Sequence, residues 1–235
     1  MVLDFVHGQH GAGRRAYVNR LVRRLYDPNA DFRFAPYDLS NVAIRNLKIG
    51  GESLDESYIA EKRVGEGLTI GVVSLGEIFS RFMKMYPTAG NWREVEPRVI
   101  DYVAQTCNGV DRLFVNHHSA ALLNDEYVQG LEDKNVIRLW EMSGKDGITT
   151  VHFLISRPEY IEKGLMHGEP EKQYPFGIQR DLLEKYYHSR RIHSVIPDKT
   201  FVHVTSVLPR RPDFLGDDVE FMVNQKELPH HLRFL

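Results

Sequence analysis

The segment that most constrains the fold is Gly8–Arg15, GQHGAGRR, which lies between an apolar run and an amphipathic helical pattern. Val2–Val6 has the length and composition of a buried strand, and the pattern after the glycines predicts a helix. A glycine-rich turn at that point lets backbone N–H groups converge on an anion at the positive end of the helix dipole. The order of strand, glycine-rich turn and helix therefore predicts a phosphate-binding loop.

The loop matches the spacing of a P-loop but not all of its residue types. Gly8 and Gly13 fit G-x-x-x-x-G-K-[ST], whereas Arg14 replaces the lysine and Arg15 replaces the residue whose hydroxyl binds magnesium. An arginine keeps the positive charge and can bind phosphate oxygens with two N–H groups, although it is bulkier than lysine. The residues that we expect to contact a bound phosphate are Gly8, His10, Gly11, Ala12, Gly13, Arg14 and Arg15.

The composition is that of an ordinary globular chain. Of the 235 residues, 42% are hydrophobic and 26% are charged, and the net charge of -2 does not indicate a generally basic nucleic-acid-binding protein. Cys107 is the single cysteine, which excludes an internal disulfide bond, and its helical apolar pattern predicts a core thiol. No apolar stretch has the length of a membrane span. We expect a cytoplasmic protein with no membrane partner, folded as one domain over residues 1–235.

Strands alternate with helices along most of the chain. Apolar periodicity predicts a first helix that ends near Tyr26 and further helices at 75–86, 92–107, 119–131 and 178–191. It predicts strands at 2–6, 69–74, 112–115, 136–140, 149–155, 201–207 and 219–223. Residues 30–68 have no sustained period and indicate a loop excursion or a small lid, and 164–177 is a second lid loop. The alternation predicts parallel βαβ units, hence an α/β fold of three layers with a central, mostly parallel sheet.

Ligands of such sheets bind beyond the carboxyl ends of the strands. That rule places Gly8–Arg15, Asn116–His118 and residues 156–159 on one rim. We expect Arg14, Asn116 and His117 to take part in catalysis and His118 to contact the substrate, because a histidine there can donate to phosphate or transfer a proton near neutral pH.

Other side chains have both a functional and a structural interpretation. Phe79, Arg81 and Phe82 are placed to stack on and clamp a base, but aromatic residues at helical spacing are more often part of a core. The basic residues near the second lid, Lys163, Lys172 and Arg180, contact phosphate or are solvated surface charges. The histidines at positions 7, 10, 117 and 118 do not have the spacing of a metal site, so we expect no metal centre made by them.

The segment FVHGQHGAGRRAYVNRLVRRL, residues 5–25, resembles the opening of thymidylate kinases in length and pattern. Later elements follow the order of that family more weakly, with LFVNHHSAALLNDEYVQG at 113–130 and VHFLISRPEYIEKG at 151–164. The resemblance implies a P-loop kinase fold, ATP and Mg²⁺ as cofactors, and an ATP-dependent (deoxy)nucleoside monophosphate kinase that acts on small nucleotides.

The sequence departs from the family at the chemical positions. Arg14 and Arg15 stand in place of lysine and hydroxyl, and Asn116–His117 stands in place of an Asp-Arg pair. Losing the hydroxyl removes a magnesium contact, so two alternatives stay open. One is a catalytically inactive, kinase-derived binding or assembly protein, and the other is a kinase acting on a modified base in DNA. The sequence leaves a homodimer and a nucleic-acid partner open as well.

Overall fold

The computed structural model describes residues 1–8, 14–26, 42–62, 67–118, 120–123, 126–144, 149–155, 200–206 and 219–223. Contacts divide the chain into two compact units. Unit one comprises Met1–Asp4, Arg15–Asn116 and Lys134–Ile148, and unit two comprises Phe5–Arg14, His117–Asp133 and Thr149–Leu235. Sheet and helices together make the protein an α/β protein.

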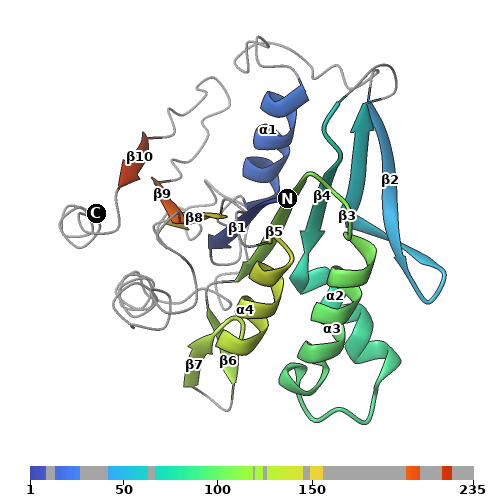
Figure 1. The fold of residues 1–235 in the computed structure, drawn as a ribbon. Helices are drawn as coiled ribbons and strands as arrows, with labels where there is room; N and C mark the ends of the chain where they lie inside the picture. The colour runs from blue at the N-terminus through green and yellow to red at the C-terminus, as the bar shows by residue number, and fades with distance from the viewer. Residues whose placement is uncertain are drawn as a thin grey trace, which may run out of the picture. The chain divides into compact units, whose positions relative to one another are not determined.

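Unit one contains a five-stranded mixed sheet. Its strand order is β1-β5-β4-β3-β2, with bounds β1 Val2–Gly8, β2 Val42–Ile49, β3 Glu52–Lys62, β4 Ile70–Ser74 and β5 Arg112–His118 (Figure 1). The pair β4–β5 is parallel, but β3 is antiparallel to both β2 and β4. The sheet of this unit is therefore mixed instead of mostly parallel as predicted.

The connection between the two parallel strands is helical, as predicted. Helices α2 (Leu75–Met85) and α3 (Trp92–Thr106) lie side by side between β4 and β5 in the chain (Figure 1). Asn91 begins α3 as its N-cap, because its side chain accepts a hydrogen bond from the backbone N–H of Arg93 at 2.9 Å. Cys107 is fully buried at the end of α3, and burial raises the pKa of its thiol to about 12, which confirms the predicted core thiol.

A buried ion pair joins the first strand to the fifth. Nε and Nη2 of Arg112 donate to the two carboxylate oxygens of Asp4, at 2.6 and 2.9 Å, and Asp4 is fully buried. The strands themselves supply apolar neighbours, such as Leu3 and Phe114, which are also fully buried. Because β1 and β5 are buried on both faces, their sequences are mostly apolar without a polar alternation, and both strands could be predicted from them.

Unit two contains the carboxyl end of β1 and the strands β8 (Thr149–Ile155), β9 (Thr200–Ser206) and β10 (Val219–Val223) in the order β1-β8-β9-β10. Strands β8 and β9 are parallel, and β10 is an antiparallel edge strand. All three lie within one residue of their predicted ranges. The lid loop at 164–177, the helix at 178–191, the segment 156–159 and the basic residues Lys163, Lys172 and Arg180 lie outside the described residues.

Two predicted elements are wrong in type. The segment predicted as a helix at 119–131 contains an antiparallel hairpin, β6 (Ala120–Leu123) with β7 (Glu126–Gln129). The segment predicted as a strand at 136–140 is part of helix α4 (Asp133–Glu141), where Val136 and Leu139 are buried three residues apart. Short apolar runs fit both periods, so periodicity alone did not separate a strand from a helix in these segments.

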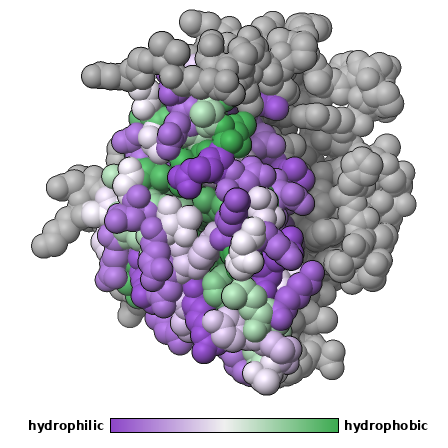
Figure 2. All heavy atoms as spheres, turned by 90° about the vertical axis from the view of Figure 1, so that its right-hand side faces the viewer, coloured by the Kyte–Doolittle hydropathy of each residue, from purple (hydrophilic) through white to green (hydrophobic). Residues whose placement is uncertain are grey.

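Residues 30–68, predicted as a loop excursion or small lid, contain the long hairpin of β2 and β3. Gly50 and Gly51 connect the strands with φ values of +60° and +88°, the conformation of a tight hairpin turn that favours glycine. Strand β2 is an edge strand with exposed Arg45 and Lys48, and such charges discourage pairing with another chain. Figure 2, viewed from the side of β2 in Figure 1, shows a mostly hydrophilic surface with a smaller apolar area. Within the described residues, no helix is long and apolar enough to cross a membrane.

Candidate functional site

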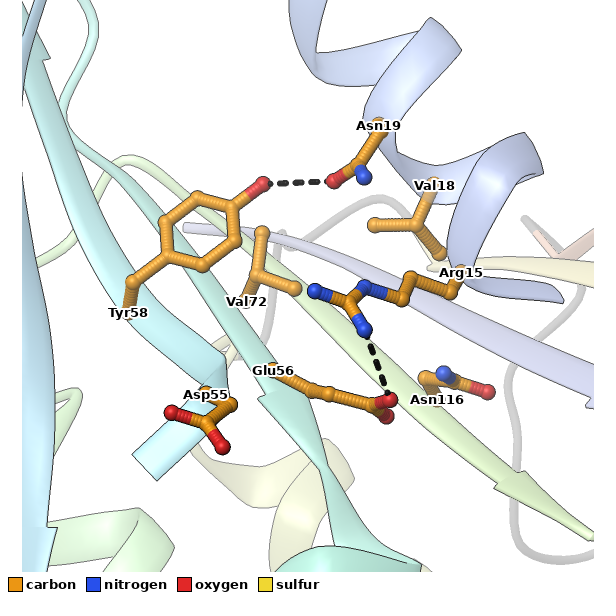
Figure 3. Close-up of a pocket in the computed structure, with 8 residues that line it drawn as sticks. All are labelled: Arg15, Val18, Asn19, Asp55, Glu56, Tyr58, Val72 and Asn116. Carbon is orange, nitrogen blue, oxygen red and sulfur yellow. Dashed lines mark hydrogen bonds and ion pairs between the residues drawn. The ribbon is translucent and has the colours of Figure 1, made fainter. Parts of the chain in front are cut away.

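A small pocket in unit one is lined by two of the predicted site residues, Arg15 and Asn116. Its volume is about 50 Å³, room for roughly three to five water molecules and not for a nucleotide. It lies where the start of α1 (Arg14–Tyr26) faces β3, β4 and β5 (Figure 3), and it is lined by Arg15, Val18, Asn19, Asp55, Glu56, Tyr58, Val72 and Asn116.

An ion pair crosses the pocket. Nη1 of Arg15 donates to Oε1 of Glu56 at 3.2 Å, and the two side chains are 60% and 35% exposed. An ion pair so exposed to water contributes about 0–1 kcal/mol to stability, so Arg15 can leave Glu56 for another anion at little cost. Arg15 is therefore available to bind another anion.

The carboxylate of Glu56 is held by neighbouring side chains. Ser74 Oγ donates to its Oε2 at 3.0 Å. Behind it, the carboxylate of Glu77, in the first turn of α2, accepts hydrogen bonds from the backbone N–H of Glu56 and from Ser57 Oγ. The backbone N–H of Ser74 in turn donates to Ser57 Oγ at 3.0 Å. These bonds fix the backbone and one oxygen of Glu56 and leave the other oxygen for Arg15.

Asn116 is the most buried polar residue of the pocket, with 7% of its surface exposed. Ser74 and Asn116 are partners in the parallel register of β4 and β5, so both stand near the carboxyl ends of their strands. Among the residues that the structure describes, nothing hydrogen-bonds to Oδ1 of Asn116. A buried acceptor in this state is unusual and calls for a ligand, a water molecule or an ion.

Tyr58 closes the pocket on the side of β3. Its hydroxyl donates to Oδ1 of Asn19 on α1 at 3.0 Å (Figure 3), and burial raises its pKa to about 12. The phenol is therefore a neutral donor at physiological pH.

In unit two, Arg14 and the histidines of β5 come together. Arg14 donates from Nη2 to Nε2 of His118 at 3.1 Å. Nδ1 of His117 donates to the carbonyl oxygen of His118 at 2.8 Å, which fixes the neutral tautomer with a lone pair on Nε2. Within the described residues no hydrogen-bond partner reaches that Nε2, although His117 is only 5% exposed.

Burial keeps the histidines of this group uncharged. Desolvation, assisted by the charge of Arg14, lowers the pKa of His117 to about 3. Desolvation also lowers the pKa of His7 well below its usual value, and the rings of His7 and His117 lie edge to face with centroids 4.1 Å apart. A proton acceptor with so low a pKa is a weak general base at neutral pH, so His117 serves better as a hydrogen-bond acceptor.

The residues predicted to clamp a base are engaged elsewhere in unit one. Phe79 meets Trp92 edge to face at 5.7 Å, Phe82 is 8% exposed and packs against Tyr86 and Tyr102, and Arg81 pairs with Glu52. None of the three lines the pocket of Arg15 and Asn116. Their substrate-binding role stays a prediction.

The loop residues His10, Gly11, Ala12 and Gly13 lie outside the described part of the chain, whereas Gly8 is the last residue of β1. Sequence reasoning missed Asp55, Glu56 and Tyr58, because it assigned no strand to their segment. The Gly50–Gly51 pair was the available signal, since two glycines between half-buried runs favour a hairpin.

In the described ranges, no group of three or more His, Cys, Asp and Glu side chains is placed to hold a metal ion. Comparison with known proteins gives no family: no family model matches the chain, and no curated protein matches it either. What the protein does must therefore be argued from its own residues.

Proposed function

We propose that the protein binds a nucleotide through its phosphates at the turn between β1 and α1, as a P-loop kinase-like protein. The observation that carries this proposal is the charge of the first turn of α1. Arg14 and Arg15 begin the helix, and the turn holds no acidic residue. Cations at a helix N-terminus are electrostatically unfavourable by about 0.3–1 kcal/mol each, whereas an anion bound there makes both favourable.

The position of the turn supports the proposal. Strand β1 ends at Gly8 and α1 begins at Arg14, so five residues connect the carboxyl end of the strand to the amino end of the helix. Strand β1 is an interior strand, with β5 as its neighbour in unit one and β8 in unit two. Phosphate sites in α/β proteins occur at this kind of junction.

The proposed reaction is ATP-dependent phosphoryl transfer to a (deoxy)nucleoside monophosphate. Such transfer depends on positioning and on cations that neutralise the phosphates, and Arg14 and Arg15 supply two fixed charges. His117 offers a neutral hydrogen-bond acceptor, and His118 holds the guanidinium group of Arg14 by a hydrogen bond. These roles rest on the resemblance of residues 5–25 to thymidylate kinases.

The second candidate function is a kinase-derived binding or assembly protein without turnover. The residue types at positions 14, 15, 116 and 117 favour it, because each differs from the group that the related kinases use in catalysis. Loss of one preorganised catalytic contact typically costs about 2.7–4 kcal/mol of transition-state stabilisation.

A coupled assay of ADP release with ATP and each of the four deoxynucleoside monophosphates separates the two. A kinase turns over at least one acceptor, and Arg14→Ala lowers kcat/KM by roughly a hundredfold, the loss typical of one preorganised donor. Arg24→Ala, a change to an exposed arginine in the last turn of the same helix, leaves the rate unchanged. Saturable ATP binding without turnover would favour the binding protein, and the absence of both would refute the proposal.

A further inference from the structure

We propose that one surface of unit one binds single-stranded nucleic acid. The surface is made by β2, the end of α2 and α3, and we call it the α2–α3 surface. Its cations are Arg45, Lys48, Lys84 and Arg98, and its aromatic residues are Tyr86 and Tyr102. The proposal goes beyond a nucleotide site between β1 and α1 and does not depend on it, because none of these residues belongs to that turn.

The α2–α3 surface lies on the face of the sheet opposite α1. Val72 of β4 lines the pocket at the start of α1, whereas a Cβ on its neighbour Gly71 would lie 3.6 Å from Sγ of Cys107 at the end of α3. Successive residues of a strand point to opposite faces, so α1 and α3 cover different sides. Arg45 is in register with Ile59, and Ile59 with Gly71. Arg45 therefore points to the side of α3.

Contacts bring the end of β2 against both helices. The hydroxyl of Tyr102 on α3 donates to the carbonyl oxygen of Lys48 at 3.0 Å. A Cβ on Gly50, in the turn after β2, would lie 4.0 Å from Sδ of Met85, the last residue of α2. In Figure 1 the turn of the β2–β3 hairpin lies beside α2 and α3. The cations of β2 and those of the helices thus share one continuous surface.

A stack of a guanidinium group on a tyrosine lies in this surface. Cζ of the exposed Arg98 is 4.2 Å from the ring centroid of Tyr86. The buried Phe82 holds both tyrosines, because its ring is nearly parallel to Tyr86 at 6.2 Å and meets Tyr102 edge to face at 5.9 Å. Bases of nucleic acids stack on aromatic rings and on guanidinium planes. The half-buried tyrosines and Arg98 offer such planes in a fixed position.

The charge of the surface is complementary to a polyanion. Together β2, α2 and α3 contain six Lys and Arg residues against four Asp and Glu residues. Each of the four acids already accepts a hydrogen bond or pairs with an arginine: Glu77, Glu94, Glu96 and Asp101. Within the described ranges, the exposed cations of these elements that pair with no carboxylate are Arg45, Lys48, Lys84 and Arg98. Four positive charges are therefore left for a ligand.

The combination of charges and planes favours a single strand of nucleic acid. An acidic peptide would neutralise the cations but would leave the stack of Tyr86 and Arg98 unused. In a duplex the faces of the bases are stacked on one another, whereas a single strand presents both phosphates and free base faces.

The test is fluorescence anisotropy of a labelled oligothymidylate of about 16 nucleotides with the full chain, without ATP, over a salt range of about 50–200 mM. We expect saturable binding with a slope of log K against log salt of roughly −3, about 0.7 for each of four phosphate contacts. Arg98→Ala removes a charge and a plane, so it should weaken binding at least about fivefold and reduce the slope by about 0.7. Tyr86→Leu removes the ring but no charge, so it should weaken binding by about the same factor and leave the slope unchanged.

Arg24→Ala is the matched control, because Arg24 is an exposed arginine of α1 on the opposite face of the sheet. It should leave both the affinity and the slope unchanged. Arg98 is exposed, so its replacement leaves the fold intact even if Tyr86→Leu disturbs it. Absence of binding, unchanged binding by Arg98→Ala, or an equal loss in Arg24→Ala would overturn the proposal.

Competitors identify the class of ligand. Polyglutamate of the same length should displace the labelled strand only weakly, and a duplex of the same length should bind less tightly than the single strand. Equal displacement by polyglutamate would assign the surface to acidic peptides, and tighter binding of the duplex would remove the role of stacking. Either result would overturn the proposal. If the oligonucleotide pattern holds but ATP does not bind, the proposed function fails and the nucleic-acid surface stands.

Discussion

Arg14 donates a hydrogen bond to Nε2 of His118 at 3.1 Å, although 104 positions separate the two residues in the chain. A guanidinium group can only donate, so Nε2 of His118 must carry a lone pair and the ring is neutral. The bond ties Arg14, a residue of the predicted phosphate loop and the first residue of α1, to the last residue of β5. It therefore fixes where the charge of Arg14 lies.

If this bond positions Arg14 for phosphate, its removal weakens ATP binding without removing the charge. We expect His118→Ala to lower ATP affinity about fivefold, the effect of roughly 1 kcal/mol. His118→Gln retains an acceptor for the guanidinium and should keep most of the affinity. Titration calorimetry with ATP measures both variants. Equal affinity of His118→Ala and wild type would show that the bond has no positioning role.

The buried neutral His117 makes stability depend on pH in the acid range. Its pKa is about 3 in the folded protein against a usual value of 6.5, so between these values the unfolded chain binds a proton that the folded chain does not. Stability contributed by the neutral ring is complete above pH 6.5 and is lost as the pH falls toward 3. The expected slope is about 1.4 kcal/mol per pH unit for this group, measured as the free energy of unfolding in urea from pH 7 to pH 4.

His117→Phe is the control for that slope. It keeps an aromatic ring beside Phe5 and His7 but cannot be protonated. We expect the variant to lose less stability than wild type between pH 6.5 and 4, with His7 accounting for part of the remainder, since its pKa is lowered too. An identical pH slope in both proteins would contradict a buried, neutral His117.

The ion pair between Asp4 and Arg112 should be one of the more sensitive polar contacts of unit one. Asp4 is fully buried and accepts hydrogen bonds from Nε and Nη2 of Arg112, whose side chain is 25% exposed, so Asp4→Ala leaves a poorly solvated charge and should cost about 3–5 kcal/mol. Glu52→Ala, which breaks the pair with Arg81, should cost no more than about 1 kcal/mol, because Glu52 is 67% exposed. Urea unfolding of the two variants measures both costs, and equal costs would refute the distinction.

Elements with a clear apolar periodicity were predicted correctly from the sequence. Segments too short to distinguish a helical period from a strand period were assigned to the wrong type. Helix α1 has apolar residues at i, i+3, i+4 and i+7, and its buried Val18 and Val22 confirm that pattern. The run around Val136 and Leu139 spans too few residues to separate a strand from a helix, and it was assigned to the wrong type. In the structure both residues are buried three positions apart, as on one face of a helix.

The candidate site was predictable only in part. Arg14, Arg15 and Asn116 follow or end apolar runs, so their place near the strand ends could be inferred. Glu56 and Tyr58 lie on β3, whose burial alternates irregularly along its length. Their approach to α1 depends on the pairing of β3 with β4, a long-range contact that the sequence did not indicate.

The most direct test of the central claim is equilibrium binding of ATP to the wild-type chain and three variants. The account predicts a saturable complex that weakens at least tenfold, by about 1.4 kcal/mol, in Arg14→Ala and in Gly13→Val, which adds a side chain to the glycine-rich run. Arg24→Ala, on the last turn of α1, should bind ATP as wild type does. A wild-type chain without a saturable ATP complex, or one whose affinity is the same in all three variants, would contradict a phosphate site between β1 and α1.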